Sequence, residues 1–322
     1  DWSLIQVISQ QILLPGWNSD DPKELELIKK NIRLVLVHEM IHMYMGDYVT
    51  YDSYIHTWLN ESFATFMATC LIQDMDDNNT WIDMINSELV KVQDAQRRKN
   101  IKPIFVSHVD TSNINNTFAR EAYDKGIWLL RMLGFLLEDT DIKNYSFGTL
   151  FRMVGEFIKE NAYGTFKPID LWNFLKDHKL NKFKYDISTI MSSWIHTAGY
   201  PVISVSYDES KRVVVEQHRL LNNASDATDI EDIPYQIPLF LKTKDGNLGR
   251  QMLTDRKLVL DTQNVFFVNY NDVAFVTVKY SLEFYRMLAE NLEKLAEVEL
   301  IQLFEDIAVL LSTNTNNSDV AL

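Results

Sequence analysis

Four residues early in the chain have the types and spacing of a catalytic metal site. His38, Glu39 and His42 form an HExxH motif, and Glu61 follows with 18 residues between it and His42. Histidines four residues apart lie on one face of a helix, about one turn apart, so both rings reach one point. Two imidazoles and a carboxylate are zinc ligands that leave a fourth position for water. The pattern predicts one Zn²⁺ per chain, held by His38, His42 and Glu61.

Glu39 has a different predicted role. It follows the first histidine on the same half of the helix, where it can take a proton from the bound water without binding the metal. HExxH alone would also be consistent with a core helix that carries two incidental histidines. Glu61, which lies on a second predicted helix over residues 58–73, favours the metal site. By itself this spacing indicates metal-assisted hydrolysis and no particular substrate.

The neighbouring residues add a family resemblance. Gly46-Asp47-Tyr48-Val49-Thr50 follows the motif, and Glu61 lies within Trp58-Leu59-Asn60-Glu61-Ser62-Phe63-Ala64. These segments resemble the gluzincin zinc aminopeptidases of the aminopeptidase N and puromycin-sensitive aminopeptidase type, whose third ligand lies at this spacing in Trp-Leu-Asn-Glu-Gly-Phe-Ala. The resemblance implies removal of the N-terminal residue from peptides with a free N-terminus. The family's amine-binding glutamate would lie immediately before Asp1.

The resemblance also assigns a role to Tyr123. This residue lies in Phe118-Ala119-Arg120-Glu121-Ala122-Tyr123-Asp124-Lys125-Gly126, ahead of an apolar helix. In the family, a Tyr-x-Lys-Gly segment at this place supplies a tyrosine whose hydroxyl stabilises the oxyanion formed when water attacks the carbonyl. Composition alone would favour a tyrosine that packs at a helix start. With the resemblance, we expect Tyr123 to be catalytic.

Departures from the family pattern keep two other hypotheses open. Met43-Tyr44-Met45 stands in place of Gln-Trp-Phe, Asp47 in place of Asn, and His56 in place of Asp. One alternative is a zinc-containing peptide-binding module with weak or no catalysis, binding nascent chains at the ribosome as a divergent fungal member does. The other is an endopeptidase, which would cleave N-terminally blocked peptides. His56 is expected to support the site or lie on the surface, without binding metal.

Composition and charge narrow the classes of partner and compartment. The formal net charge of −14 argues against nucleic acid or an anionic membrane as a direct partner. Cys70 is the only cysteine, which excludes an internal disulfide and favours a reducing, cytoplasmic compartment. No apolar run approaches the length of a membrane span, and no signal peptide is recognised.

Hydrophobic periodicity predicts an α+β protein with three parts. Residues 1–199 are expected to form a thermolysin-like, mainly helical zinc domain that opens with a strand over 1–14. Residues 200–279 alternate as in a small β-sandwich, and residues 280–322 are expected to start a truncated C-terminal helical domain. Within the first part, Asp20 or Asp21 is expected to cap a helix over 24–45. We expect an irregular crossing over 48–55 and an exposed polar helix over 87–99.

Overall fold

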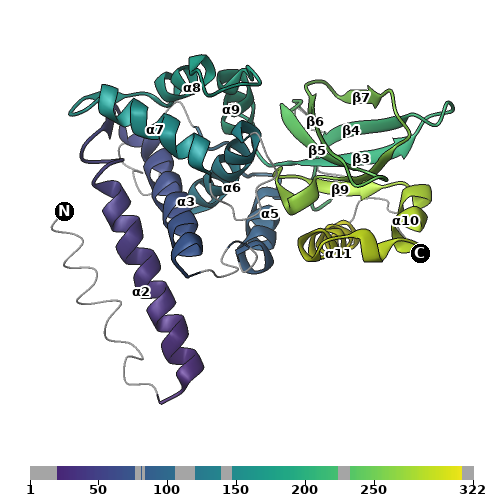
Figure 1. The fold of residues 1–322 in the computed structure, drawn as a ribbon, viewed down its shortest axis with the longest axis horizontal. Coiled ribbons are helices and arrows are strands. Elements are labelled where there is room, and N and C mark those ends of the chain that lie inside the picture. The colour runs from purple at the N-terminus through teal and green to yellow at the C-terminus, as the bar shows by residue number, and fades with distance from the viewer. Residues whose placement is uncertain are drawn as a thin grey trace. The chain divides into compact units, whose positions relative to one another are not determined.

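The computed structural model describes residues 20–76, 81, 84–105, 120–138, 147–223 and 233–313. The chain mixes helices and strands, which confirms the α+β class (Figure 1). It forms two compact units. Unit 1 comprises Asp1–Asp83, Val109–Leu130 and Leu137–Lys184, and unit 2 comprises Met84–His108, Arg131–Leu136 and Tyr185–Leu322. The strand predicted over 1–14 lies outside the described residues, and the division at 199/200 and 279/280 stays a prediction.

Where the structure describes it, unit 1 consists of helices and one very short sheet. Its elements are α2 (Pro22–His42), η2 (Tyr54–His56), α3 (Thr57–Asp76), the first part of α6 (Arg120–Leu137), α7 (Gly148–Glu160) and α8 (Pro168–Asp177), with strands β1 (Thr50–Tyr51) and β2 (Thr165–Phe166). Aromatic side chains fill its core: the Phe66 ring lies 5.9 Å from that of Trp81 and 5.2 Å from that of Phe147. This core surrounds α3, whose Trp58, Leu59 and Phe63 are also buried.

The ends of α2 are set by local chemistry. Asp21 is the N-cap and its side chain accepts a hydrogen bond from the Lys23 amide at 2.9 Å, while Pro22 occupies the first turn. The predicted capping role therefore falls on Asp21. The helix ends at His42, three residues earlier than predicted, and the chain turns at Gly46 with φ +145°. Only glycine adopts that backbone conformation without strain.

The segment after this turn contains a strand that the sequence did not reveal. Residues 48–55 were expected to be irregular, but Thr50 pairs with Thr165 and Tyr51 with Phe166 in parallel. The Thr50 hydroxyl also donates to the Gly46 carbonyl at 2.7 Å. A strand of two residues leaves no detectable alternation in the sequence, so this expectation was wrong for a simple physical reason.

The described residues of unit 2 form seven strands in two sheets. They are β3 (Pro201–Tyr207), β4 (Val213–Arg219), β5 (Ile237–Thr243), β6 (Leu248–Leu253), β7 (Lys257–Leu260), β8 (Val265–Val268) and β9 (Thr277–Tyr280). The sheet orders are β7-β4-β3-β9 and β6-β5-β8, and only the β3–β9 pair is parallel within them. The buried Tyr280 hydroxyl links the two sheets, because it accepts from the Val268 amide at 2.9 Å and donates to the Val268 carbonyl at 3.2 Å.

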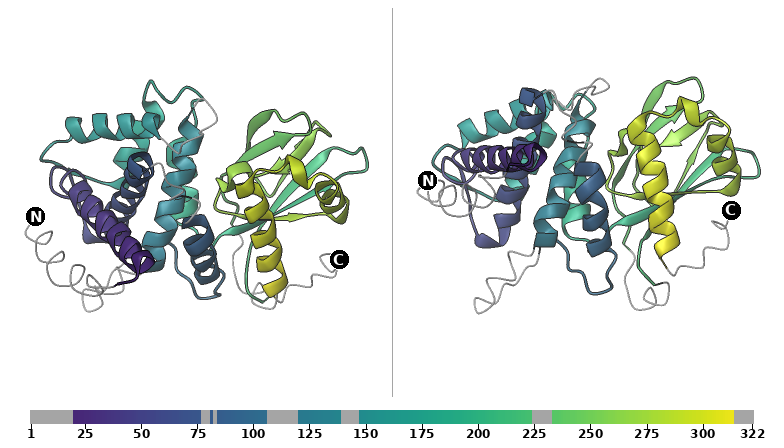
Figure 2. Two further views of the ribbon diagram at one scale, coloured as in Figure 1. Left: turned by 60° about the horizontal axis from the view of Figure 1, so that its bottom comes forward. Right: turned by 90° about the horizontal axis from the view of Figure 1, so that it is seen from below.

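The helices of unit 2 include one that was expected to be exposed. They are η3 (Ile85–Leu89), α5 (Val90–Gln96), α9 (Ile187–Ile195), α10 (Leu282–Ala289) and α11 (Glu297–Ser312), which packs on β9 and η6 (Tyr270–Asp272) (Figure 2). Gln93, Gln96 and Arg97 are buried, so the prediction of a solvated helix over 87–99 was wrong. Arg97 donates to Asp94 at 2.8 Å and to Asn222 at 3.0 Å, which makes its burial tolerable. No helix in the described part of the chain combines the length and apolar character that a membrane span requires.

The turn after α2 generates a first prediction. A Cβ at Gly46 would lie 2.8 Å from the His42 carbonyl oxygen, so Gly46→Ala adds a backbone clash to the strain of a positive φ. We expect a loss of stability of about 2–4 kcal/mol in the free energy of unfolding. Gly246 also has a positive φ, +80°, with no atom near its would-be Cβ. Gly246→Ala is the matched control and should cost about 1–2 kcal/mol. Equal losses in denaturant titrations would contradict the clash at Gly46.

Candidate metal centre

The three predicted ligands meet between two helices of unit 1. His38 and His42 lie on the last two turns of α2 and Glu61 on the second turn of α3. The His38 and His42 Nε2 atoms are 3.0 Å apart. Glu61 places one carboxylate oxygen 3.3 Å from His38 Nε2 and the other 3.7 Å from His42 Nε2. Among the residues described by the structure, these three form the group that could hold a metal, with their donor atoms within 4.8 Å of one another.

The outer nitrogens of both histidines have partners that fix the rings. His42 Nδ1 lies 3.3 Å from the Met45 carbonyl oxygen, and His38 Nδ1 lies 3.2 Å from the Thr65 hydroxyl. A carbonyl only accepts, so His42 carries its proton on Nδ1 and keeps an Nε2 lone pair for the centre. The Thr65 oxygen can accept from His38 in the same way. Such partners orient imidazole ligands and strengthen them.

Thr65 was missed by sequence reasoning. It lies four residues after Glu61, one turn along the same face of α3, and this spacing was the available signal. The hydrogen bond itself joins residues 27 positions apart on two helices. Its existence depends on how α2 and α3 pack, which no local pattern specifies.

The electrostatics of the cluster suit a cation. Burial favours the neutral form of Glu61, but hydrogen bonds and charge from His38 and His42 outweigh it and lower the pKa of Glu61 to about 2. For His42, burial lowers the pKa, whereas Glu61, the Met45 carbonyl and Glu39 raise it more, so the net shift is upward from 6.5. An ionised carboxylate and two convergent imidazole nitrogens in a half-buried site are donors that fit Zn²⁺.

Of the two predicted catalytic residues, Glu39 lies on the same helix as His38 and His42. Glu39 is partly exposed on α2, and its charge is one of the causes that raise the pKa of His42. Tyr123 belongs to the first turn of α6, but its side chain lies outside the described structure. The structure thus brings together the three ligands, places Glu39 beside them, and leaves the role of Tyr123 as a prediction.

Other histidines have their own partners. His56 is buried with Nε2 3.5 Å from an Asp52 carboxylate oxygen, and burial lowers its pKa while Asp52 opposes that shift. His178 Nε2 lies 3.0 Å from Glu156. His218 is exposed on β4. Within the described ranges, none of these histidines belongs to a group that could hold a metal.

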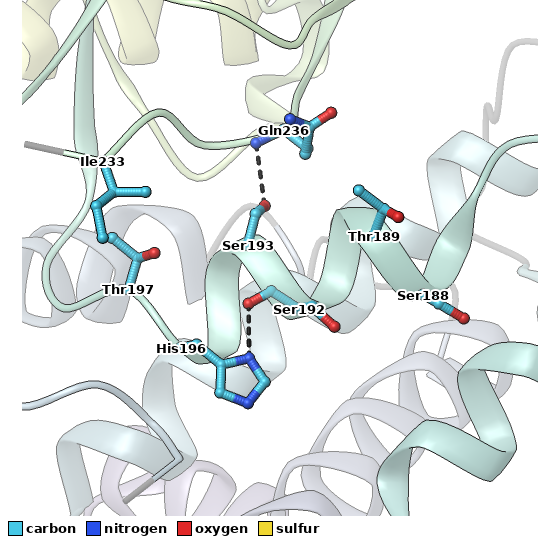
Figure 3. A pocket seen from close by; sticks show the side chains of 8 residues that line it. All are labelled: Ser188, Thr189, Ser192, Ser193, His196, Thr197, Ile233 and Gln236. Carbon is cyan, nitrogen blue, oxygen red and sulfur yellow. Dashed lines mark hydrogen bonds between the residues drawn. The ribbon is translucent and has the colours of Figure 1, made fainter.

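A separate pocket lies in unit 2 and has a cavity volume of about 490 Å³ (Figure 3). Hydroxyl-bearing side chains of α9 line it together with His196, Thr197, Ile233 and Gln236. His196 Nδ1 is 2.9 Å from the Ser192 carbonyl oxygen, and the Ser193 hydroxyl accepts a hydrogen bond from the backbone amide of Gln236 at 3.0 Å. Among the described residues that line the pocket, none is a carboxylate or a thiol.

Comparisons with known proteins agree with this chemistry. Residues 1–194 match the peptidase family M1 domain. Protein TMA108 of Saccharomyces cerevisiae is 30% identical over 305 residues, which covers 88% of this chain and 31% of that protein. Aminopeptidase 2, mitochondrial, of the same organism is 28% identical over 324 residues, covering 98% and 32%. Tricorn protease-interacting factor F2 of Thermoplasma volcanium is 29% identical over 287 residues, covering 88% and 34%. The chain spans about a third of the length of these relatives.

The Thr65 hydrogen bond predicts a measurable loss of metal affinity. Thr65→Val keeps the shape of the side chain but removes the acceptor for His38, and we expect Zn²⁺ affinity to fall by about 10–100-fold. Thr65→Ser should retain most of the affinity. Thr69→Val is the matched control, because the buried Thr69 hydroxyl donates to the Thr65 carbonyl one turn further along α3. A competition titration with a chelating dye measures all three variants. Equal affinities for Thr65→Val and Thr69→Val would contradict a role of Thr65 in orienting His38.

The pKa shifts predict how metal affinity depends on pH. Zn²⁺ must displace a proton from His42, whose pKa is raised above 6.5, whereas Glu61 with a pKa of about 2 stays ionised. Affinity should therefore fall about tenfold per pH unit below the His42 pKa. Metal titrations between pH 5.5 and 8 test this, with His178→Gln as a control outside the centre. An affinity that stays constant between pH 5.5 and 8 would contradict the assignment.

In the metal-free protein the same two shifts act on folding with opposite signs. The raised pKa of His42 contributes stability that is fully present below 6.5 and is lost as the pH rises through the folded value. The lowered pKa of Glu61 contributes stability that is present above 4.5 and is lost as the pH falls towards about 2.

Proposed function

The chain belongs to peptidase family M1, and on that premise we propose that it carries the active centre of a zinc aminopeptidase that removes the N-terminal residue from peptides. The observation that carries this proposal is the convergence of His38, His42 and Glu61, with Glu39 beside them. One Zn²⁺ per chain would be held by these three ligands. Relatives named as aminopeptidases, at 27–28% identity, support peptide substrates with a free N-terminus.

The proposed reaction uses each residue for one task. When bound, Zn²⁺ would supply a Lewis acid that polarises the scissile carbonyl and lowers the pKa of a water towards about 7. Glu39 accepts the proton of the attacking water and then donates it to the nitrogen of the leaving amine. Tyr123, assigned from the family resemblance, donates its hydroxyl hydrogen bond to the oxyanion of the tetrahedral intermediate.

Several finer features are proposed with this function. Residues 1–199 would form a thermolysin-like gluzincin domain, residues 200–279 a β-sandwich, and residues 280–322 the first helices of a larger helical domain. We also propose a cytoplasmic location, from the single cysteine. The preferred N-terminal residue of the substrate is left open.

A second candidate function is a zinc-containing peptide binder with weak or no catalysis. The departures at Met43–Met45, Asp47 and His56 support it, because they surround an intact ligand set. One of these departures, His56, is buried and makes a contact with Asp52. The name of one relative, Tricorn protease-interacting factor F2, is also consistent with protein partners. Binding of nascent chains at the ribosome belongs to this candidate.

Replacing the proposed base separates the two candidates. Glu39→Gln preserves side-chain size but cannot accept a proton, so we expect kcat to fall by at least about 100-fold while zinc content stays at that of the wild type. The substrates are unblocked peptides, and the readouts are released amino acid and zinc by metal analysis. Glu24→Gln, an exposed change on the first turn of α2, is the matched control.

Three other results would change the conclusion. Wild-type protein that binds zinc and peptide but releases no amino acid would support the binding module. Cleavage of N-terminally blocked peptides would support an endopeptidase. Unchanged turnover in Glu39→Gln would contradict the role of Glu39 as the base.

A further inference from the structure

Helices α3 and α6 approach each other closely at Ser62 and Gly126. A Cβ placed on Gly126 would lie 2.1 Å from Ser62 Oγ, 2.9 Å from Ser62 Cβ and 3.2 Å from Trp58 Cε3. Ser62 is fully buried, and so are Trp58 and Gly126. The hydroxyl could rotate away, but the Ser62 Cβ is fixed to the backbone of α3. The two helices would therefore have to separate to admit any side chain at position 126.

The backbone does not explain the glycine. Gly126 lies inside α6 and has no positive φ, so every residue type can adopt its conformation. Glycine in a helix interior is less favourable than alanine. Because Gly126 has no side chain, the two helices can approach each other closely at this position.

This crossing joins the two parts of the proposed active centre. Ser62 directly follows the ligand Glu61 on α3. Tyr123 precedes Gly126 by three residues, about 4.5 Å along the axis of α6. A change in the spacing at the crossing therefore moves the turn that carries Tyr123 relative to the turn that carries Glu61, and no residue of α2 is among the nearest atoms at the crossing.

We propose that the Ser62–Gly126 crossing is a positioning element, which sets the distance between Tyr123 and the metal ligand Glu61. The inference rests on the proposed function, since it assumes a catalytic Tyr123. The crossing has room for one side chain. Ser62 stands where the aminopeptidases that this segment resembles have glycine, whereas Gly126 matches the glycine of their Tyr-x-Lys-Gly segment, so in this chain the single side chain at the crossing comes from α3.

A set of variants tests the geometry without using activity. Gly126→Ala should lower the melting temperature by several degrees. Adding Ser62→Ala should not restore it, because the Cβ that would lie 2.9 Å away remains, whereas Ser62→Gly with Gly126→Ala should restore most of it. Gly155→Ala on α7 is the matched control, since its Cβ would meet no atom within 4 Å and alanine should stabilise the helix. If Ser62→Gly does not restore the melting temperature of Gly126→Ala, the inferred close contact between Ser62 and Gly126 is wrong.

Kinetics on the zinc-loaded protein test the positioning role. Gly126→Ala should keep the wild-type zinc content and lose kcat by about 100-fold, the scale expected for a misplaced catalytic group. In a Tyr123→Phe background, Gly126→Ala should cause no further loss, because the group that it displaces is already absent. The Ser62→Gly, Gly126→Ala double variant should recover most of kcat. If Gly126→Ala lowers kcat by the same factor in the Tyr123→Phe background as in the wild type, the positioning role is wrong.

The two sets of measurements separate failure of the inference from failure of the proposed function. In one outcome, Ser62→Gly restores the melting temperature of Gly126→Ala, but the wild-type protein hydrolyses no peptide. The close contact of the two helices would then be confirmed, and both the aminopeptidase function and the positioning role would be wrong. Hydrolysis that is unaffected by Gly126→Ala would overturn the positioning role and leave the aminopeptidase intact.

Discussion

Two imidazole nitrogens and a carboxylate held at one point are the constraint on which unit 1 depends. The lone pairs of His38 and His42 face each other across 3.0 Å, an arrangement that a cation or a shared proton must stabilise. The raised pKa of His42 and the lowered pKa of Glu61 are both consequences of this geometry. Helices α2 and α3 must therefore be held at a short, fixed distance, because they bring three electron-rich donor groups to one point. Contacts on the outer faces of the two helices have to maintain that distance.

Helix α3 meets most of that requirement. Three of its residues contact three different neighbours. Glu61 lies against the histidines of α2, Ser62 contacts α6, and the Thr65 hydroxyl lies within hydrogen-bond distance of His38 Nδ1. Phe63 and Phe66 are buried in the aromatic core. A helix buried on nearly all sides has few ways to shift, so a site built on it is more precisely placed than one built on a loop.

Local patterns predicted the parts of the fold that depend on local physics. The convergence of His38 and His42 follows from helical spacing, and the structure places their Nε2 atoms 3.0 Å apart, while their role as ligands stays a prediction. The sequence offered Asp20 or Asp21 as the cap, and the structure selects Asp21. The β1–β2 pair and the burial of Arg97 were not predicted. Thr50 pairs with a residue 115 positions away, and Arg97 is buried because Asn222 is close, so both depend on contacts between distant segments.

Holding a metal and hydrolysing a peptide make different demands on this structure. The proposed metal binding would need only α2, α3 and the partners of His38 and His42, which lie on α3 and on the turn that follows α2. The close crossing of α3 with α6 adds nothing to the ligand set, and it requires a glycine that weakens α6. Such a local cost is reasonable where α6 must bring a group to the metal, as Tyr123 would. A close crossing that exists to place Tyr123 would be useful to a hydrolase and of no use to a protein that only binds metal and peptide.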